Sequence, residues 1–181
     1  MNYVTRNLEK QVLTAARAFP AVVVTGARRT GKTWMLRHLF QKSSYHLFED
    51  PDVISRFRRD PQGFLDSVQL PAILDEIQNT PEVFNYVRSR ADREPRKMGR
   101  WFLTGSQESG LMRNVTESMA GRAAVLHLLP LSVAESPKVT LLHGGYAEVL
   151  AKPAAARLWL PSQWLSTSTN NGISISRSTI S

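Results

Sequence analysis

The chain has 181 residues, a net charge of +8 and no cysteine, and 42% of its side chains are hydrophobic. The hydrophobic content and the charged content of 21% are ordinary for a globular protein, and the length suits one good-sized domain or one domain plus a fragment of a second. The absence of cysteine excludes disulfides and thiolate metal sites. The sequence contains neither an apolar run of membrane-spanning length nor a signal-peptide core, so we expect a cytoplasmic protein.

Short apolar strands and helices are predicted to alternate along the chain. The predicted elements are, in order, a helix over 5–18, a strand over 21–25, a helix over 32–40, a strand over 45–50, a helical stretch over 53–68 broken at Pro61, a strand over 71–78, a helix beginning with the cap Thr80, a strand over 100–106, a polar helical segment ending at Arg122, and a strand over 123–132. This alternation is typical of the α/β class, with a parallel sheet sandwiched by helices. Ligands bind such sheets at the carboxyl ends of the strands.

Residues 26–33, GARRTGKT, match the phosphate-binding pattern G-x-x-x-x-G-K-[ST], the Walker A motif, between a predicted strand and a predicted helix. Glycines at 26 and 31 allow the backbone to curl so that its N–H groups face a phosphate. Lys32 is expected to reach the β- and γ-phosphates, and the Thr33 hydroxyl to ligate Mg²⁺. The other loop residues expected to line the ATP phosphates are Ala27, Arg28, Arg29 and Thr30.

Polar residues also follow two other predicted strands. Asp75 ends the apolar run AILD and is expected to hold Mg²⁺ through its water shell, as in a Walker B motif, while Glu76 is the candidate base for an attacking water. An adjacent Asp-Glu pair favours hydrolysis over transfer to a small molecule. Thr104 and Ser106, at the tip of the strand WFLTG, are both candidates to contact that water or the γ-phosphate.

Two groups of basic residues suggest further roles. Arg122 precedes the last predicted strand and is a candidate to stabilise transition-state charge, in its own subunit or in a neighbour's. Residues 88–100, RSRADREPRKMGR, form a basic patch that could attract nucleic acid, although no aromatic residue interleaves to stack bases. A solvated helix face explains the same patch.

The quoted motifs, together with DEIQ, LTGS and AGR, resemble in order the landmarks of a prokaryotic AAA+-like P-loop ATPase family with a C-terminal domain of unknown function. The resemblance runs from about residue 6 to about residue 150. It implies a RecA/AAA+-like sheet in which extra strands separate the loop strand from the Asp-Glu strand. It also implies ATP and Mg²⁺ as ligands, strand-tip hydroxyls as the γ-phosphate sensor, and Arg122 as a finger that would make a homo-oligomer relevant.

The last part of the chain departs from this pattern. We expect an ATPase core over 1–136, the start of a lid or C-terminal region over 137–160, and a disordered or frameshifted tail over 161–181. The tail is rich in Ser and Thr and poor in residues that build a core. A shifted reading frame from about Leu160 would make the chain a truncated member, and a natural serine-rich tail is the alternative.

Two other functions remain open at this stage. A P-loop kinase of a small metabolite would use Arg56, Arg58 and Arg59 as lid residues, but Glu76 beside Asp75 argues against it. A non-hydrolysing nucleotide-binding or nucleic-acid-binding module would bind ATP without turnover and bind DNA in a salt-dependent way.

Overall fold

The computed structural model describes residues 3–106, 119–140 and 144–151. The elements are α1 (Glu9–Ala18), β1 (Ala21–Thr25), α2 (Lys32–Leu39), β2 (Ser44–Leu47), α3 (Pro51–Arg59), α4 (Pro61–Ser67), β3 (Ala72–Asp75), the 3-10 turn η1 (Ile77–Asn79), α5 (Val83–Arg93), β4 (Trp101–Gly105), β5 (Ala123–His127) and α7 (Ala147–Ala151). No helix within these ranges is long and apolar enough to cross a membrane.

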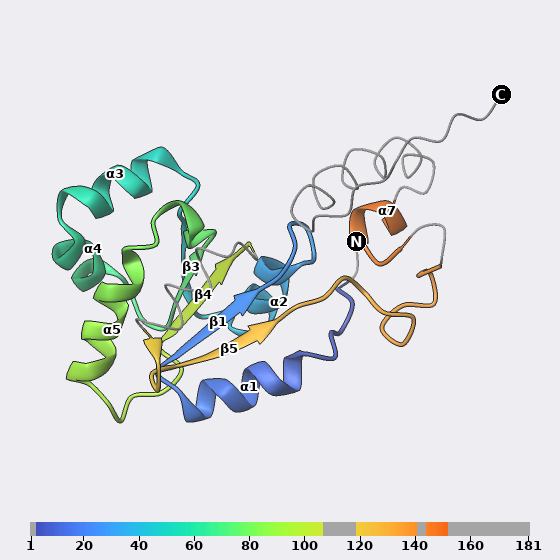
Figure 1. Cartoon of the computed structure of the whole chain (residues 1–181), viewed down its shortest axis with the longest axis horizontal. Helices are drawn as coiled ribbons and strands as arrows, with labels where there is room; N and C mark the ends of the chain where they lie inside the picture. Colours follow the sequence, from blue (N-terminus) through green and yellow to red (C-terminus); the bar gives the residue numbers. More distant parts are fainter. Residues whose placement is uncertain (1–2, 107–118, 141–143, 152–181) are drawn as a thin grey trace, which may run out of the picture.

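The five strands form one parallel sheet in the order β2-β3-β4-β1-β5. Their carboxyl ends therefore lie along one edge, toward which the arrows in Figure 1 point. One strand, β4, separates the loop strand β1 from the Asp-Glu strand β3. The predicted α/β parallel sheet is confirmed.

Helices cover both faces of this sheet because alternate residues of the strands face opposite ways. Ala21 and Val23 of β1 pack in a cluster with α3, α4 and α5, whereas Val22 and Val24 pack with α1 and α2. Figure 1 shows α3, α4 and α5 grouped on the left and α1 beneath β1 and β5. All five residues of β1 are buried, as expected of a strand covered on both faces.

Several boundaries differ from the sequence prediction. The last strand ends at His127 rather than near residue 132, because its partner β1 ends at Thr25, which is paired with His127. The strand predicted over 71–78 ends at Asp75, since Glu76 takes a left-handed conformation and η1 follows.

The predicted cap at Thr80 is wrong in detail. The helix α5 begins at Val83, and the buried Thr80 hydroxyl has no hydrogen-bond partner in the part of the chain that the structure describes. The predicted helical segment before Arg122 falls largely on residues 107–118, outside the described residues, as does the tail over 161–181. The domain boundaries at 136 and 160 stay predictions.

Candidate functional site

The loop over 26–33 connects the carboxyl end of β1 to the start of α2. Both of its glycines are required by geometry. Gly26 adopts a φ of +150°, and a Cβ there would lie 2.3 Å from the Leu128 carbonyl oxygen. Gly31 adopts a φ of +95° immediately before α2, a conformation that side chains with a Cβ rarely adopt. The loop is therefore curled tightly against the chain that leaves β5.

The Lys32 side chain lies inside this curl. It is buried, and its Nζ donates to the carbonyl oxygens of Gly26 and Ala27, each at 3.1 Å. Burial lowers the pKa of the Lys32 ammonium, and the carboxylates of Glu76 and Asp75 oppose that shift. A bound phosphate would supply the negative charge that this desolvated cation favours.

The other loop residues divide between the interior and the surface. The Thr30 hydroxyl donates to the Ala27 carbonyl at 2.9 Å, which closes the loop on itself. Arg28 pairs with Glu49 at 2.5 Å on the exposed side. Arg29 is exposed and takes a left-handed φ of 64°. These residues therefore shape the loop mainly through its backbone.

A buried carboxylate at the end of β3 gathers three hydroxyl groups, which we call the Asp75 cluster (Thr33, Tyr45, Asp75 and Thr104). Thr33 Oγ1 lies 3.0 Å and 2.8 Å from the two Asp75 carboxylate oxygens, and Tyr45 Oη lies 2.7 Å from one of them. The Thr104 hydroxyl, from β4, donates to the other. Burial, and then the bond to Asp75, raise the pKa of the Tyr45 phenol, so it stays a donor.

This donor set fits Mg²⁺. The ion prefers oxygen ligands and is commonly held by one or two carboxylates together with substrate phosphates and water. Thr33 and Asp75, the two predicted ligands, are in direct contact across the start of α2 and the end of β3. No group of three His, Asp or Glu side chains suited to a metal occurs within the described residues, so an all-protein cage is not built there.

Glu76 follows Asp75 and is held in place by two neighbours. Its φ of 56° is left-handed, and its backbone N–H donates to Thr104 Oγ1 at 3.1 Å. Its carboxylate accepts from Gln78 Nε2 at 2.8 Å, and Gln78 Oε1 in turn accepts the Ser106 backbone N–H at 3.2 Å. The hydroxyl of Thr104 is thus committed to Asp75 and Glu76, whereas Ser106 lies next to the Glu76–Gln78 pair.

Arg122 lies away from this group. Its carbonyl accepts the N–H of Ala21 at the first residue of β1, so it sits at the amino edge of the sheet, opposite the loop over 26–33. Its side chain pairs with Asp92 at 2.6 Å and donates to the Ala120 carbonyl. Arg122 is therefore not positioned to act on the loop of its own chain, and action on a neighbouring subunit stays a prediction.

Three residues of this region were not found from the sequence. Tyr45 looked like an ordinary strand residue, although β2 lies beside β3 and its side chain is long enough to reach Asp75. Gln78 was present in the motif DEIQ, but its role depends on the turn η1. Arg6 was assigned to a helix, whereas it precedes α1 and contacts Thr30 of the loop over 26–33.

The sequence model of a family described as "AAA domain" matches residues 18–136. Two curated relatives, uncharacterized proteins of Mycobacterium bovis and Mycobacterium tuberculosis, are each 28% identical over 156 residues. The match covers 86% of this chain and 32% of each relative, so the chain spans about a third of the length of the curated relatives it matches.

Two solved structures are similar over about three quarters of the chain. A Walker-type ATPase of Pyrococcus abyssi gives a TM-score of 0.48 at 17% identity, covering 74% of this chain and 56% of that one. The Thermotoga maritima RuvB Holliday junction branch migration motor gives a TM-score of 0.47 at 19% identity, covering 73% and 48%.

Proposed function

The chain belongs to the AAA-domain family, and from this premise we propose that it binds ATP and hydrolyses it with Mg²⁺ to drive a conformational change. The observation that carries the proposal is the contact between Thr33, at the start of α2, and Asp75, at the end of β3, which supports a nucleotide site built from both at one edge of the sheet. A cytoplasmic location is part of the proposal.

In this proposal each residue has one task. Lys32 and the loop N–H groups bind the β- and γ-phosphates, and the positive end of α2 faces the same charge. Thr33 and Asp75 would hold Mg²⁺, which neutralises phosphate charge when bound. Glu76 orients the attacking water and takes its proton, while Gln78 fixes the direction of the Glu76 carboxylate. Both predicted strand-tip hydroxyls, those of Thr104 and Ser106, are retained as candidates to contact the γ-phosphate or the attacking water; the Thr104 hydroxyl also contacts Asp75 and accepts the Glu76 N–H.

The test is Mg²⁺-dependent release of phosphate from ATP by the purified chain. We expect turnover to be lost in Lys32→Ala and in Glu76→Gln, with ATP binding lost in the first and retained in the second. Glu82→Gln, at an acid on the other side of η1, is the matched control and keeps its turnover. Equal turnover in the wild type and Glu76→Gln would contradict the assignment of the base.

Binding without turnover is the second candidate function. One observation favours it: Arg122 lies at the amino edge of its own sheet. Hydrolysis then requires an arginine donated by a neighbouring subunit. We expect specific activity to rise with protein concentration if Arg122 acts in a homo-oligomer. Mixing Arg122→Ala with Lys32→Ala would then restore turnover that neither variant shows alone.

Nucleic acid is the remaining candidate partner. The basic residues of α5 and the chain after it support it, but Arg90, Lys97 and Arg122 are each paired with an acid. Salt-dependent DNA binding would favour that partner, and its absence at low salt would exclude it.

A further inference from the structure

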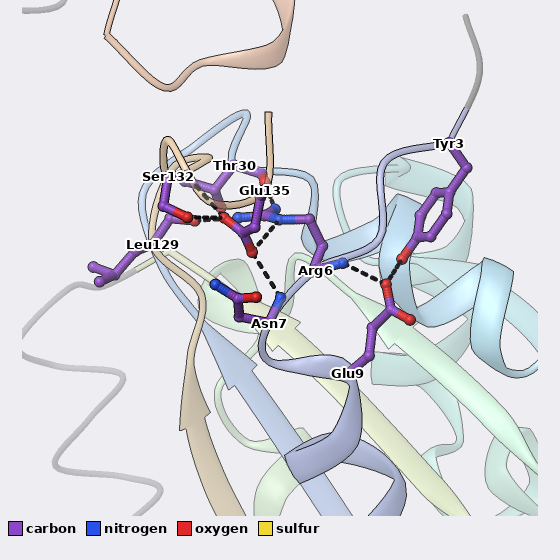
Figure 2. A network of polar contacts seen from close by, with 8 residues as sticks. All are labelled: Tyr3, Arg6, Asn7, Glu9, Thr30, Leu129, Ser132 and Glu135. Carbon is purple, nitrogen blue, oxygen red and sulfur yellow. Dashed lines mark hydrogen bonds and ion pairs between the residues drawn. The ribbon is translucent and has the colours of Figure 1, made fainter. Parts of the chain in front are cut away.

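A buried arginine outside the predicted motifs contacts the phosphate loop. Arg6 precedes α1, and each of its three guanidinium nitrogens donates to a different acceptor (Figure 2). Nη1 donates to the Thr30 carbonyl at 2.7 Å, Nη2 to the Leu129 carbonyl at 2.7 Å, and Nε to the Glu135 carboxylate at 3.1 Å. Its side chain is 6% exposed, so these contacts replace water.

Glu135 fixes this arginine from the other side. One of its carboxylate oxygens accepts from Arg6 and from the backbone N–H of Asn7, and the other accepts from the N–H and hydroxyl of Ser132 (Figure 2). Burial alone would raise the pKa of the Glu135 carboxyl, but these hydrogen bonds and the Arg6 charge hold it below its ordinary value. Both charges of the pair are thus compensated inside the protein.

The Thr30 carbonyl is the point at which this network reaches the loop. The Thr30 carbonyl lies one residue before the first carbonyl in the backbone hydrogen bonds of α2, because the first of these bonds runs from the Met35 N–H to the Gly31 carbonyl. Within the described residues, its hydrogen-bond partner is Arg6. In a trans peptide the C=O and the following N–H point in opposite directions. A Thr30 carbonyl held by Arg6 therefore turns the N–H of Gly31 away from the guanidinium.

We propose that Arg6 is a positioning residue of the phosphate site, which orients the Thr30–Gly31 peptide so that the Gly31 N–H is presented to the bound phosphate. Because the same guanidinium is held by Leu129 and Glu135, the shape of the loop depends on the segment that follows β5. This inference rests on the proposed nucleotide binding. It adds that the segment over 129–135 sets phosphate affinity without touching the ligand.

The test is the affinity of the full chain for MgATP and for inorganic pyrophosphate, measured by calorimetry at a temperature at which circular dichroism shows every variant folded. Arg6→Lys keeps the charge but cannot reach three acceptors with one ammonium. We expect it to bind both ligands about tenfold more weakly or worse. We expect the same of Arg6→Ala, with affinity partly restored by a few millimolar guanidinium ion, which leaves the wild type unchanged.

Two controls separate positioning from general destabilisation. Val87→Ala removes a buried side chain from α5, on the opposite face of the sheet, and we expect wild-type affinity from it. Glu9→Gln weakens the anchor of the Arg6 backbone N–H without touching the guanidinium, and it also keeps its affinity. If Arg6→Ala does not fold, Arg6→Lys decides the question alone.

Wild-type affinity in a folded Arg6→Lys would overturn the inference and leave the proposed nucleotide binding intact. An equal loss of affinity in Val87→Ala would overturn it too, because affinity would then follow stability. A wild-type chain that binds neither MgATP nor pyrophosphate would overturn the proposed function, and this inference with it.

Discussion

The two edges of the sheet differ in how deeply their charged side chains are buried. At the carboxyl edge Lys32, Asp75 and Arg6 are buried, and each makes two or more hydrogen bonds. At the amino edge the acids are open to water: the side chains of Asp66 and Asp92 are 64% and 47% exposed, and each pairs with one arginine. A cleft of about 370 Å³ near Asp66 is lined by further basic side chains.

This difference indicates which charged side chains are held in fixed positions. Removing a charge from water costs free energy, which only several well-placed partners offset, so buried charges have fixed positions. Exposed pairs cost and contribute little. The basic patch over 88–100 is the most conspicuous charge feature of the sequence, yet the acid is exposed in each of these described ion pairs around it. Arg6 and Tyr45 are less conspicuous in the sequence. Arg6 is buried, and Tyr45 contacts the buried Asp75.

The largest effect is expected from Asp75→Asn. The amide keeps the size of the carboxylate; its oxygen can accept hydroxyl bonds on one side and its NH2 group can donate to a hydroxyl oxygen on the other, but it removes the charge that would hold Mg²⁺. We expect ATP turnover to fall by at least about a hundredfold. The midpoint of urea unfolding should stay the same or rise, because a buried charge is removed. Asp66→Asn, at the exposed edge, is the matched control and should change neither quantity.

The next largest effect is expected from Glu135→Gln, which leaves the buried Arg6 charge without its counterion. We expect a loss of about 3 kcal/mol in the free energy of unfolding at pH 7, measured with urea.

The same variant gives a pH dependence. Because the pKa of Glu135 is lowered in the folded protein from its ordinary value of 4.5, its contribution is complete above about pH 4.5 and is lost as the pH falls through the lower folded value. The stability gap between the wild type and Glu135→Gln should therefore close in acid. A gap of constant size down to pH 3 would contradict the buried ion pair.

A smaller effect is expected from Gln78→Met, which removes the amide between Glu76 and Ser106 while keeping similar length. If Gln78 only orients the Glu76 carboxylate, the turnover rate should fall about tenfold while the Kd for MgATP stays unchanged. Steady-state kinetics and calorimetry give the two quantities separately. A weaker Kd with an unchanged rate would assign Gln78 to binding instead.

The smallest effect is expected from Asp92→Asn, which breaks the exposed pair with Arg122. We expect an unfolding midpoint indistinguishable from that of the wild type, measured by thermal denaturation in low salt. If the midpoint falls clearly, the amino edge carries structural charge and the contrast between the two edges is wrong.

The sequence was sufficient for the fold class and for the loop, because apolar runs of strand length and the glycine pattern are local features. It also predicted that Thr33 and Asp75 lie at the same edge, because the carboxyl ends of parallel strands lie along one edge of a sheet. It could not show that Tyr45 reaches Asp75, because that contact depends on which strands are neighbours. Arg6 was hidden for the same reason: its partners are 24 to 129 residues away.

The most direct test of the central claim is the calorimetric Kd for ATP with and without Mg²⁺, in the wild type and in Thr33→Val. The account predicts that Mg²⁺ strengthens ATP binding in the wild type and has little effect in the variant, because the hydroxyl that meets Asp75 is gone. ATP binding that is equally independent of Mg²⁺ in both proteins would contradict a single site built from the loop and the Asp75 cluster.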